Sequence, residues 1–353
     1  MGLPLQWANI GSMENKGFEF TLNTVNISNR DFQWRTNVTF SLNRNKVASM
    51  NTQNAFIDKT YQNSGQTEVI TRTAVGHPVS QFYGYKAIGR INSASDYLID
   101  NGDGTSTVKI ATPVLRVGDC VVNSGTDKGS LVKQVYIGDY IYEDLNNDGV
   151  IDEKDQTYLG SPLPKFTYGI NNTFKYKNFD LTVFLYGSYG NKAMNYLSRR
   201  ITNPNSSGNV HRSVANHARL GYLDGNPENT NVWNMYILPG SNGLCRMSVN
   251  DANDNDRISS LYVEDASFLR IQNIALGYTL PKQWLKKLKI ENARIYANIK
   301  NVYTFTGYDG YDPEIGSTQA QYSYSGQSML MYGVDTGRCP SPRIYTFGID
   351  LTF

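Results

Sequence analysis

Apolar and polar residues alternate along several long stretches of this sequence. In the clearest stretch, residues 31–43, every second side chain is largely apolar and the intervening ones are polar. A period of two places the two sets on opposite faces of a β-strand. The stretch is also longer than the roughly 5–6 residues of an ordinary soluble strand. One face holds Phe32, Trp34, Thr36, Val38, Phe40 and Leu42, and the other holds Gln33, Arg35, Asn37, Thr39, Ser41 and Asn43.

The same pattern predicts further strands over residues 17–28, 165–176, 179–189, 268–280, 293–303 and 341–353. Three hairpins follow, which turn at residues 29–30, at 177–178 and across the longer segment 281–292. The apolar parity of 268–280 shifts near Gln272, which predicts a β-bulge. The last predicted strand ends on Phe353 after an apolar stripe, and a terminal aromatic residue of this kind is typical of strands that the barrel-assembly machinery recognises. The alternative is an ordinary strand that ends the chain. That stripe consists of Tyr345, Phe347, Ile349, Leu351 and Phe353.

The predicted connections differ in length on the two sides of these strands. One side has only short turns, whereas the other has long polar segments at residues 46–164, 190–267 and 304–340. This asymmetry is typical of outer-membrane barrels. We therefore predict an all-β fold, the C-terminal portion of a large antiparallel transmembrane β-barrel with long extracellular loops. A β-sandwich or a propeller remains an alternative from face alternation alone.

The predicted strand number is odd, whereas single-chain bacterial barrels use even numbers. Either a further wall strand lies within 46–164, with residues 81–89 as the candidate, or strands precede residue 1. The opening residues also lack the basic start and apolar stretch of a signal peptide, which an outer-membrane protein requires. We therefore expect either that this chain lacks its true N-terminus or that the protein does not belong to the outer-membrane class.

Composition narrows the classes of function. The chain is rich in Tyr (25) and Gly (31), and its net charge of +2 gives no field that would recruit nucleic acid. No run of eighteen apolar residues predicts a membrane helix. The basic cluster Lys282, Lys286, Lys287 and Lys289 is expected to be a solvated turn. Three widely spaced cysteines, Cys120, Cys245 and Cys339, allow at most one disulfide and form no framework.

The sharpest local motif covers residues 144–155 and predicts a structural Ca²⁺ site. Its oxygen-bearing residues recur with the spacing of a calcium-binding loop, and Gly149 stands at the sixth position, where such loops turn sharply. The twelfth position is Asp rather than the usual Glu, and no long helices flank the motif. An Asx-rich turn that satisfies its own backbone is the alternative. The predicted ligands are Asp144, Asn146, Asp148, Val150 through its carbonyl, Asp152 and Asp155.

Catalytic motifs are poorly represented, and we expect no enzyme. The histidines His77, His211 and His217 fit neither HExxH nor a zinc pair, and no GxSxG, P-loop or GxGxxG motif occurs. Several aromatic residues suit either stacking on sugar rings or a membrane-interface girdle, and the sequence does not separate these readings. They are Tyr83, Tyr85, Trp233, Tyr236, Tyr322 and Tyr324.

An ordered series of short motifs resembles the SusC/RagA family of TonB-linked outer-membrane proteins from Bacteroidetes over nearly the whole chain. The series begins with Asn9-Ile10-Gly11, Asn15-Lys16-Gly17-Phe18-Glu19 and Val75-Gly76-His77-Pro78, and continues through Gly138-Asp139, the 144–155 loop and Gly160-Ser161-Pro162-Leu163-Pro164. It ends with Ser267-Phe268-Leu269-Arg270, Leu276-Gly277-Tyr278, Asn301-Val302-Tyr303, Gly310-Tyr311-Asp312-Pro313-Glu314 and residues 340–353. No single motif is decisive, but their order is specific.

The resemblance implies a barrel of about 22 strands around an N-terminal plug. It also implies import of glycans or peptides, a SusD-like surface lipoprotein as a lid, and energy from the TonB complex. Within this sequence we recognise no plug and no TonB-binding segment. We expect the chain to supply about the last third of the barrel wall. TonB coupling is therefore expected through the missing N-terminal part, and no substrate-contacting residues are carried over from the family.

We therefore expect residues 1–353 to form part of an importer in the cell outer membrane. Its partners would be outer-membrane lipid, the lipoprotein lid, TonB and an oligosaccharide or peptide, with no nucleic acid. One rival is a secreted calcium-dependent β-sandwich that binds carbohydrate. The other is a surface hydrolase.

Overall fold

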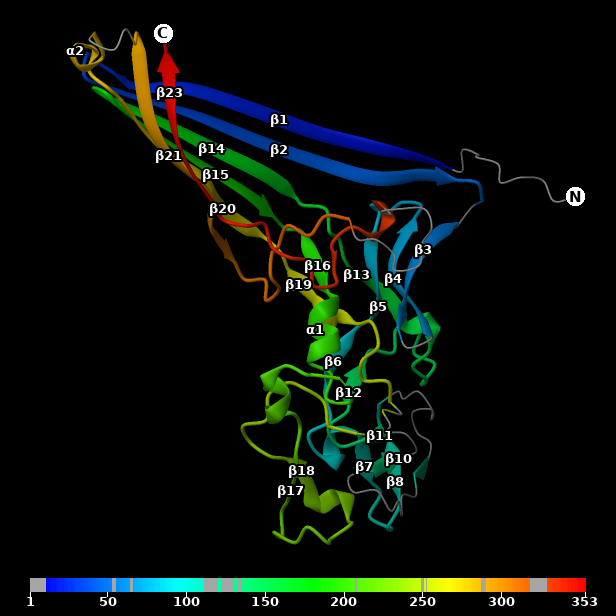
Figure 1. Cartoon of the computed structure of the whole chain (residues 1–353). Coiled ribbons are helices and arrows are strands. Elements are labelled where there is room, and N and C mark those ends of the chain that lie inside the picture. The colour runs from blue at the N-terminus through cyan, green and yellow to red at the C-terminus, as the bar shows by residue number, and fades with distance from the viewer. Residues whose placement is uncertain are drawn as a thin grey trace, which may run out of the picture.

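The computed structural model describes residues 11–52, 55–63, 66–110, 120–121, 130–132, 135–206, 208–248, 251, 253–286, 290–317 and 329–353. It consists of one large antiparallel sheet, here called the wall, and a body formed by the long connections between its strands, here called the cap (Figure 1). The cap comprises the described parts of residues 51–165, 190–267 and 307–343. The cap hangs from one end of the wall, and the short turns lie at the other end (Figure 1).

The wall has seven strands, and each pairs with the next wall strand along the chain. This meander arises because consecutive antiparallel strands joined by hairpins become neighbours. Strands β1 and β23 form its two edges. The strands are β1 (Gly11–Ser28), β2 (Phe32–Met50), β14 (Phe166–Tyr176), β15 (Phe179–Tyr189), β20 (Phe268–Thr279), β21 (Asn292–Thr306) and β23 (Ile344–Thr352). All seven correspond to strands predicted from the alternation.

The first hairpin is longer than the alternation predicts. Residues 11–16 of β1 pair with residues 44–50 of β2, beyond the apolar stripe. Both strands are mainly polar there, so hydrophobic periodicity gives no signal. The bulge predicted near Gln272 is confirmed, because the register of β20 shifts between Ile271 and Asn273 against β21. It also shifts against β15 at the same point.

Two of the short turns are tight, and the third holds a short helix. At the first, the Asn29 side-chain oxygen accepts hydrogen bonds from the backbone N–H groups of Asp31 (3.1 Å) and Phe32 (2.8 Å). At the second, Lys177 adopts a left-handed φ of 50° between β14 and β15. Helix α2 (Lys282–Leu285) lies in the third turn, between β20 and β21.

The cap contains small sheets rather than only irregular loops. One sheet has the order β13-β5-β4-β3, one has β19-β16-β22, and the others have two or three strands. Helix α1 (Tyr196–Ile201) follows β16. The strands are β3 (Phe56–Asn63), β4 (Gln66–Ala74), β5 (Gln81–Tyr85), β6 (Ala87–Arg90), β7 (Leu98–Asp100), β8 (Ser106–Val108), β9 (Cys120–Val121), β10 (Ser130–Val132), β11 (Val135–Tyr136), β12 (Tyr140–Tyr142), β13 (Gln156–Gly160), β16 (Lys192–Asn195), β17 (Leu220–Tyr222), β18 (Met235–Ile237), β19 (Val263–Asp265) and β22 (Val334–Asp335).

The hydrophobic core lies in the cap. One cluster surrounds Phe82 and Met194, which are both fully buried, and a second surrounds Ile91 and Met235. The long connections were expected to be polar loops, but they fold on cores of their own. Apolar residues scattered along them come together only when the segments meet. Among the described residues, no helix has the length and apolar character needed to cross a bilayer.

The prediction that residues 81–89 supply a further wall strand is wrong. Strand β5 lies between β13 and β4 in the cap, and β6 pairs with β12. Phe82 (0% exposed) and Tyr83 (9% exposed) point to opposite sides of β5 and are both buried. A wall strand faces lipid on one side, so a strand covered on both faces belongs inside a body.

Candidate functional site

One face of the wall is apolar across all seven strands. The register aligns Val38 with Ile170, Leu185 and Ile271 along one row, and Leu276 with Ala297 and Phe347 along another. None of these side chains is buried: Leu276 is 49% exposed, Phe347 is 80% exposed, and the other five are half-buried. A β-sandwich would bury such a face against a second sheet. A row of uncovered apolar side chains this wide instead suits contact with lipid.

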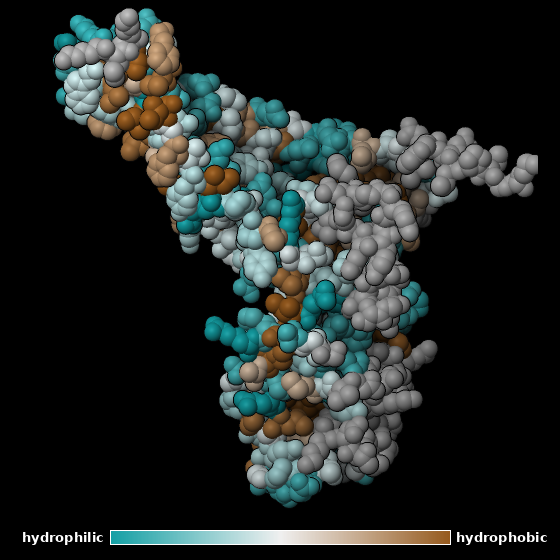
Figure 2. Space-filling view, in the orientation of Figure 1, coloured by the Kyte–Doolittle hydropathy of each residue, from teal (hydrophilic) through white to brown (hydrophobic). Residues whose placement is uncertain are grey.

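Aromatic residues gather at both ends of this apolar face. At the short-turn end, Phe179 and Tyr278 have ring centroids 4.6 Å apart. At the cap end, Phe166 lies 5.3 Å from Phe40 and 5.0 Å from Tyr189. Two aromatic bands that flank an apolar band are typical of a transmembrane barrel. Figure 2 shows hydrophobic residues grouped at the end of the wall that carries α2 and the C-terminus.

The opposite face of the wall is polar and internally paired. Asn37 donates to Asn23 over 2.6 Å across the first hairpin. Further along the sheet, Arg294 in β21 forms an ion pair with Asp350 (3.2 Å) on the neighbouring strand β23. It also forms one with Asp180 (2.7 Å) on β15, across the intervening strand β20. Side chains that keep this much polarity suit a wetted surface such as a barrel lumen.

An arginine on the wall connects it to the cap. Arg270 in β20 is 3% exposed and forms ion pairs with Asp312 and with Glu314 (2.9 Å). Its Nε also donates to Thr304 on β21 over 2.9 Å. Both carboxylates come from the connection between β21 and β23, so this contact fixes a loop that alternation does not position.

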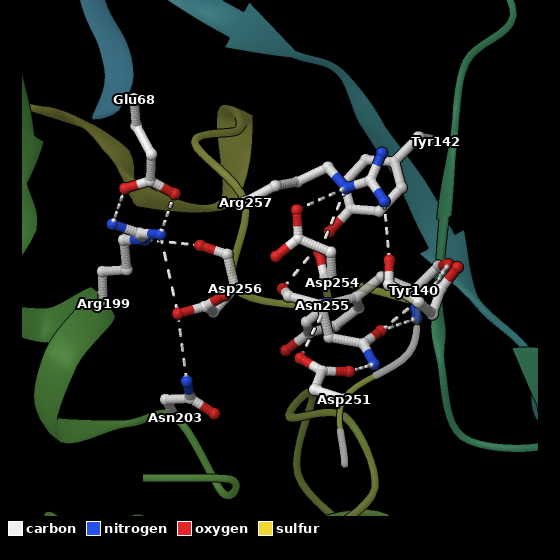
Figure 3. A network of polar contacts seen from close by, with 11 residues as sticks. Glu68, Tyr140, Tyr142, Arg199, Asn203, Asp251, Asp254, Asn255, Asp256 and Arg257 are labelled. Atoms are coloured by element: carbon white, nitrogen blue, oxygen red, sulfur yellow. Dashed lines mark hydrogen bonds and ion pairs between the residues drawn. The ribbon is translucent and has the colours of Figure 1, made fainter. Parts of the chain in front are cut away.

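A buried ion-pair network lies at the centre of the cap (Figure 3). The guanidinium of Arg199 in α1 is 1% exposed and binds both oxygens of Glu68 in β4, each over 2.6 Å. Asp256 lies 3.5 Å from the same guanidinium and accepts from Asn203. Burial raises the pKa of Glu68 against the opposing effect of Arg199. The network therefore joins three segments that are distant in the sequence.

A second polar cluster lies beside the first, and its residues Asp254, Asn255 and Arg257 are labelled in Figure 3. Asp139 is fully buried and accepts from Arg246 (2.7 Å), Asn255 (3.0 Å) and the Tyr136 backbone (2.9 Å). Burial raises the pKa of Asp139 to about 6, although Arg246 lowers it in part. The guanidinium of Arg257 lies over the rings of Tyr85 and Tyr142. These contacts hold residues 253–257 against the strands of the cap.

A groove of about 670 Å³ opens next to these clusters. The charged residues of its lining are Arg72, Arg257, Asp58, Glu68, Glu153 and Asp254. Arg72 binds both oxygens of Asp58 over 2.7 Å and lies over the rings of Phe56 and Tyr83. The lining therefore has two arginines and four acidic side chains, so the groove is polar with an excess of acidic groups.

The predicted calcium loop forms a turn whose side chains bind its own backbone. The second oxygen of Asp144 accepts from Gly149 N–H (2.8 Å), and Asp155 accepts from the N–H groups of Leu145 (2.9 Å) and Asp152 (2.7 Å). Asn146, Asp148 and Asp152 likewise accept backbone N–H groups within the loop. These bonds match the Asx-rich alternative.

The calcium prediction fits this geometry only in part. The other carboxylate oxygen of Asp144 is buried without a hydrogen-bond partner, as a ligand oxygen would be before an ion binds. In the described part of the chain, however, no three His, Cys, Asp or Glu side chains are grouped so as to hold a metal ion. Calcium at Asp144, Asn146, Asp148, Val150, Asp152 and Asp155 therefore stays a prediction.

Among the described aromatic residues considered for sugar stacking, Tyr83, Tyr85 and Trp233 have other contacts. Tyr83 is buried against Arg72 and Tyr158, and Trp233 packs against the second hydrophobic cluster. Tyr322 and Tyr324 lie outside the described residues.

Cys245 is buried, Cys339 is exposed, and both are free thiols, while the Cys120 side chain lies outside the described set.

Comparison with known proteins places this geometry in a family. The chain is 31% identical to TonB-dependent receptor P3 of Formosa agariphila, over 100% of the chain and 30% of that protein. It is 23% identical to TonB-dependent receptor SusC of Bacteroides thetaiotaomicron, over 98% of the chain and 27% of that protein. The chain belongs to the SusC/RagA family of TonB-dependent receptors. No family model matches it.

Solved structures agree on the fold of this TonB-dependent receptor chain. The structure of the RagAB peptide transporter matches with a TM-score of 0.57 and 19% identity, over 99% of the chain and 30% of the matched chain. The predicted fold class is thus confirmed: the wall is part of an antiparallel transmembrane β-barrel. The chain spans about 30% of the length of the curated relatives it matches.

Membership also assigns the two faces of the wall. TonB-dependent receptors of the SusC and RagA type are outer-membrane β-barrels, so the predicted localisation is confirmed. The apolar face with its two aromatic bands then faces lipid, and the face with the Arg294 ion pairs faces the lumen. Sequence reasoning gave Arg199 no role, and it named Asp139 and Arg270 only within motifs of the family resemblance and not as buried charges. A single arginine or aspartate within a polar segment gives no signal of burial.

Proposed function

We propose that this receptor chain forms part of an importer that carries glycans or peptides across the outer membrane. The observation that supports this most directly is the two-faced wall, with lipid-facing apolar rows and a polar, charge-paired inner face. Membership in the TonB-dependent receptors supports the same conclusion. No nucleophile and base pair stands out in the polar clusters described above, and we propose a transport role rather than an enzymatic one.

The cap supports a binding role at the cell surface. It emerges from the end of the wall opposite the short turns, which is the extracellular end in outer-membrane barrels. Its buried ion pairs make it a defined body that can present fixed surfaces to a ligand or a partner protein. We propose that a SusD-like lipoprotein covers it, and that the TonB complex supplies energy through parts of the receptor outside these 353 residues.

Uptake by whole cells tests the proposal. We would delete the gene, restore it on a plasmid, and measure entry of labelled oligosaccharides and of labelled oligopeptides of similar size. We expect the deletion to abolish entry of one class, restoration to recover it, and loss of TonB to abolish it again. Normal entry of both classes without the gene would refute the importer, and entry without TonB would refute energy coupling.

A separate measurement addresses the hydrolase rival. The purified intact receptor is incubated with the class of oligomer that enters the cell, and the products are separated by size. Unchanged oligomer supports a transporter. Shortened products that disappear when the receptor is removed with a specific antibody would favour the hydrolase.

A further inference from the structure

The turn between β20 and β21 lies against the lipid-facing side of the wall. Ala293, near the start of β21, has the same parity as Ile295 and belongs to the apolar face. Ile295 is 46% exposed and Leu351, the partner of Ala293, is 48% exposed, but Ala293 is 2% exposed. Something therefore covers this corner of the face. Among the described residues of the turn, those of helix α2 contact β21, and Leu285 of the helix is 4% exposed.

This arrangement leaves the other side chains of the helix outside. Trp284 is 61% exposed, and Lys282 and Lys286 are exposed on either side of it along the chain. Within the described residues, neither lysine forms an ion pair. The sequence of this turn, residues 281–291, contains four lysines and a single acid, Glu291. The helix therefore presents an exposed indole between two cations.

The helix lies just beyond one aromatic band of the wall. Ile295, two residues after Ala293, pairs with Tyr278, which itself contacts Phe179. Those two rings belong to the band at the short-turn end. Trp284 is thus at the depth where hydrocarbon gives way to lipid headgroups, the depth at which Trp is enriched in membrane proteins. Lysines at this depth reach charged headgroups with their ammonium groups while their stems stay on apolar surface.

We propose that Trp284, Lys282 and Lys286 form a contact site for anionic phospholipid in the leaflet on the short-turn side of the membrane. The indole ring inserts among the headgroups, and the two ammonium groups bind their phosphates. Charge complementarity selects this occupant, because the site presents two cations that form no ion pair with an acidic side chain of the described residues. The proposal rests on the outer-membrane location and not on import, so failure of the uptake experiment leaves it standing.

Fluorescence in defined vesicles tests the position of the indole. The intact receptor is reconstituted in neutral phosphatidylcholine containing lipids brominated either near the headgroup or deep in the acyl chain. We expect a part of the tryptophan emission to be quenched more by the shallow bromines, and that part to be absent in Trp284→Phe. Equal quenching of the wild type and Trp284→Phe at both depths would overturn the proposal.

Lipid selectivity tests the two lysines. Relative association of phosphatidylglycerol over phosphatidylcholine is measured with spin-labelled lipids for the wild type, for Lys282→Gln with Lys286→Gln, and for a matched pair in the cap, Lys86→Gln with Lys154→Gln. We expect selectivity to fall about fivefold for each turn lysine removed at low salt, and to be unchanged in the cap pair. Equal loss in the two pairs, or no loss in either, would overturn it.

Inorganic phosphate distinguishes a lipid headgroup from a free anion. It is added to the receptor in detergent without phospholipid, and the Trp284-dependent emission is followed. We expect no change, because the proposed site needs the membrane surface to bring phosphate and indole together. A saturable change that Trp284→Phe abolishes would assign the site to free phosphate instead.

Discussion

Replacing Val183 by arginine should destabilise the receptor in the membrane, whereas the same change at the adjacent Thr182 should not. Val183 lies in the lipid-facing row and pairs with Ile274 on β20. Thr182 points to the lumen side and pairs with Thr173 and Ala275. The two positions are adjacent in β15, so they lie on the same strand at nearly the same depth and face opposite sides of the wall.

The size of the effect follows from the position of Val183 along the strand. The 11 residues of β15 span about 34 Å at about 3.4 Å per step, and a tilt of about 45° reduces this to about 24 Å of height, close to the apolar band of about 25 Å. By the same measure, Val183 lies about 10 Å above the short-turn end of β15, within a few Å of the midplane. Arginine at the midplane of a barrel costs about 2–4 kcal/mol.

This cost corresponds to a decrease of about 30- to 700-fold in the ratio of folded to unfolded receptor. For Thr182→Arg we expect a change within about 0.5 kcal/mol, because the new side chain reaches water. The assay is urea unfolding of the intact receptor folded into vesicles, followed by the shift in gel mobility between unheated and heated samples. Equal costs for the two variants, or a larger cost for Thr182→Arg, would refute the assignment of the faces.

Three further predictions concern the cap. Arg199→Met should destabilise the cap by about 3–5 kcal/mol, because Glu68 keeps a buried charge without a partner. As a control, Lys86→Met removes an exposed ion pair and should cost under about 1 kcal/mol. Equal rates of hydrogen exchange in β4 of the two variants would contradict this prediction. The pKa of Asp139 is raised by burial from 3.8 to about 6, so the folded cap holds this proton more tightly and loses stability as pH rises from about 4 to 6. Asp139→Asn should flatten that part of the stability–pH profile, and an unchanged slope would show that Asp139 does not titrate there. If calcium binds residues 144–155, Ca²⁺ should raise the melting temperature of the cap. Asp144→Asn should abolish this rise, because the Asn side chain keeps the hydrogen bond to Gly149 but loses the charge. No rise in the wild type would support the Asx-rich turn.

The wall was predictable because the two faces of every strand contact different surroundings. Lipid on one side and water on the other impose a period of two, which residues 31–43 and 341–353 show directly. Even the bulge near Gln272 was visible as a change of parity. The pattern predicted no strand at residues 11–16 and 44–50, where that contrast ends, because strands with polar residues on both faces have no such period.

The cap was not predictable in the same way. Phe82 and Met194 are over a hundred residues apart and meet in one core, and Arg199 reaches Glu68 across a similar separation. Such partners follow from how the connections fold over one another, and neither composition nor spacing encodes them locally. The turn at residues 281–292 shows the same limit: its lysines were visible in the sequence, but only the burial of Ala293 indicates which side of the wall they occupy.

The sequence by itself therefore determined the wall strands, their order and which residues share a face. It also determined the spacing of the 144–155 loop. Tertiary structure alone decided that the long connections form a body with its own cores, that β5 belongs to this body, and that three buried charges hold it together. The physical reason is that a strand in a membrane wall is specified by its two surroundings, residue by residue, whereas a packed core is specified by contacts between distant segments.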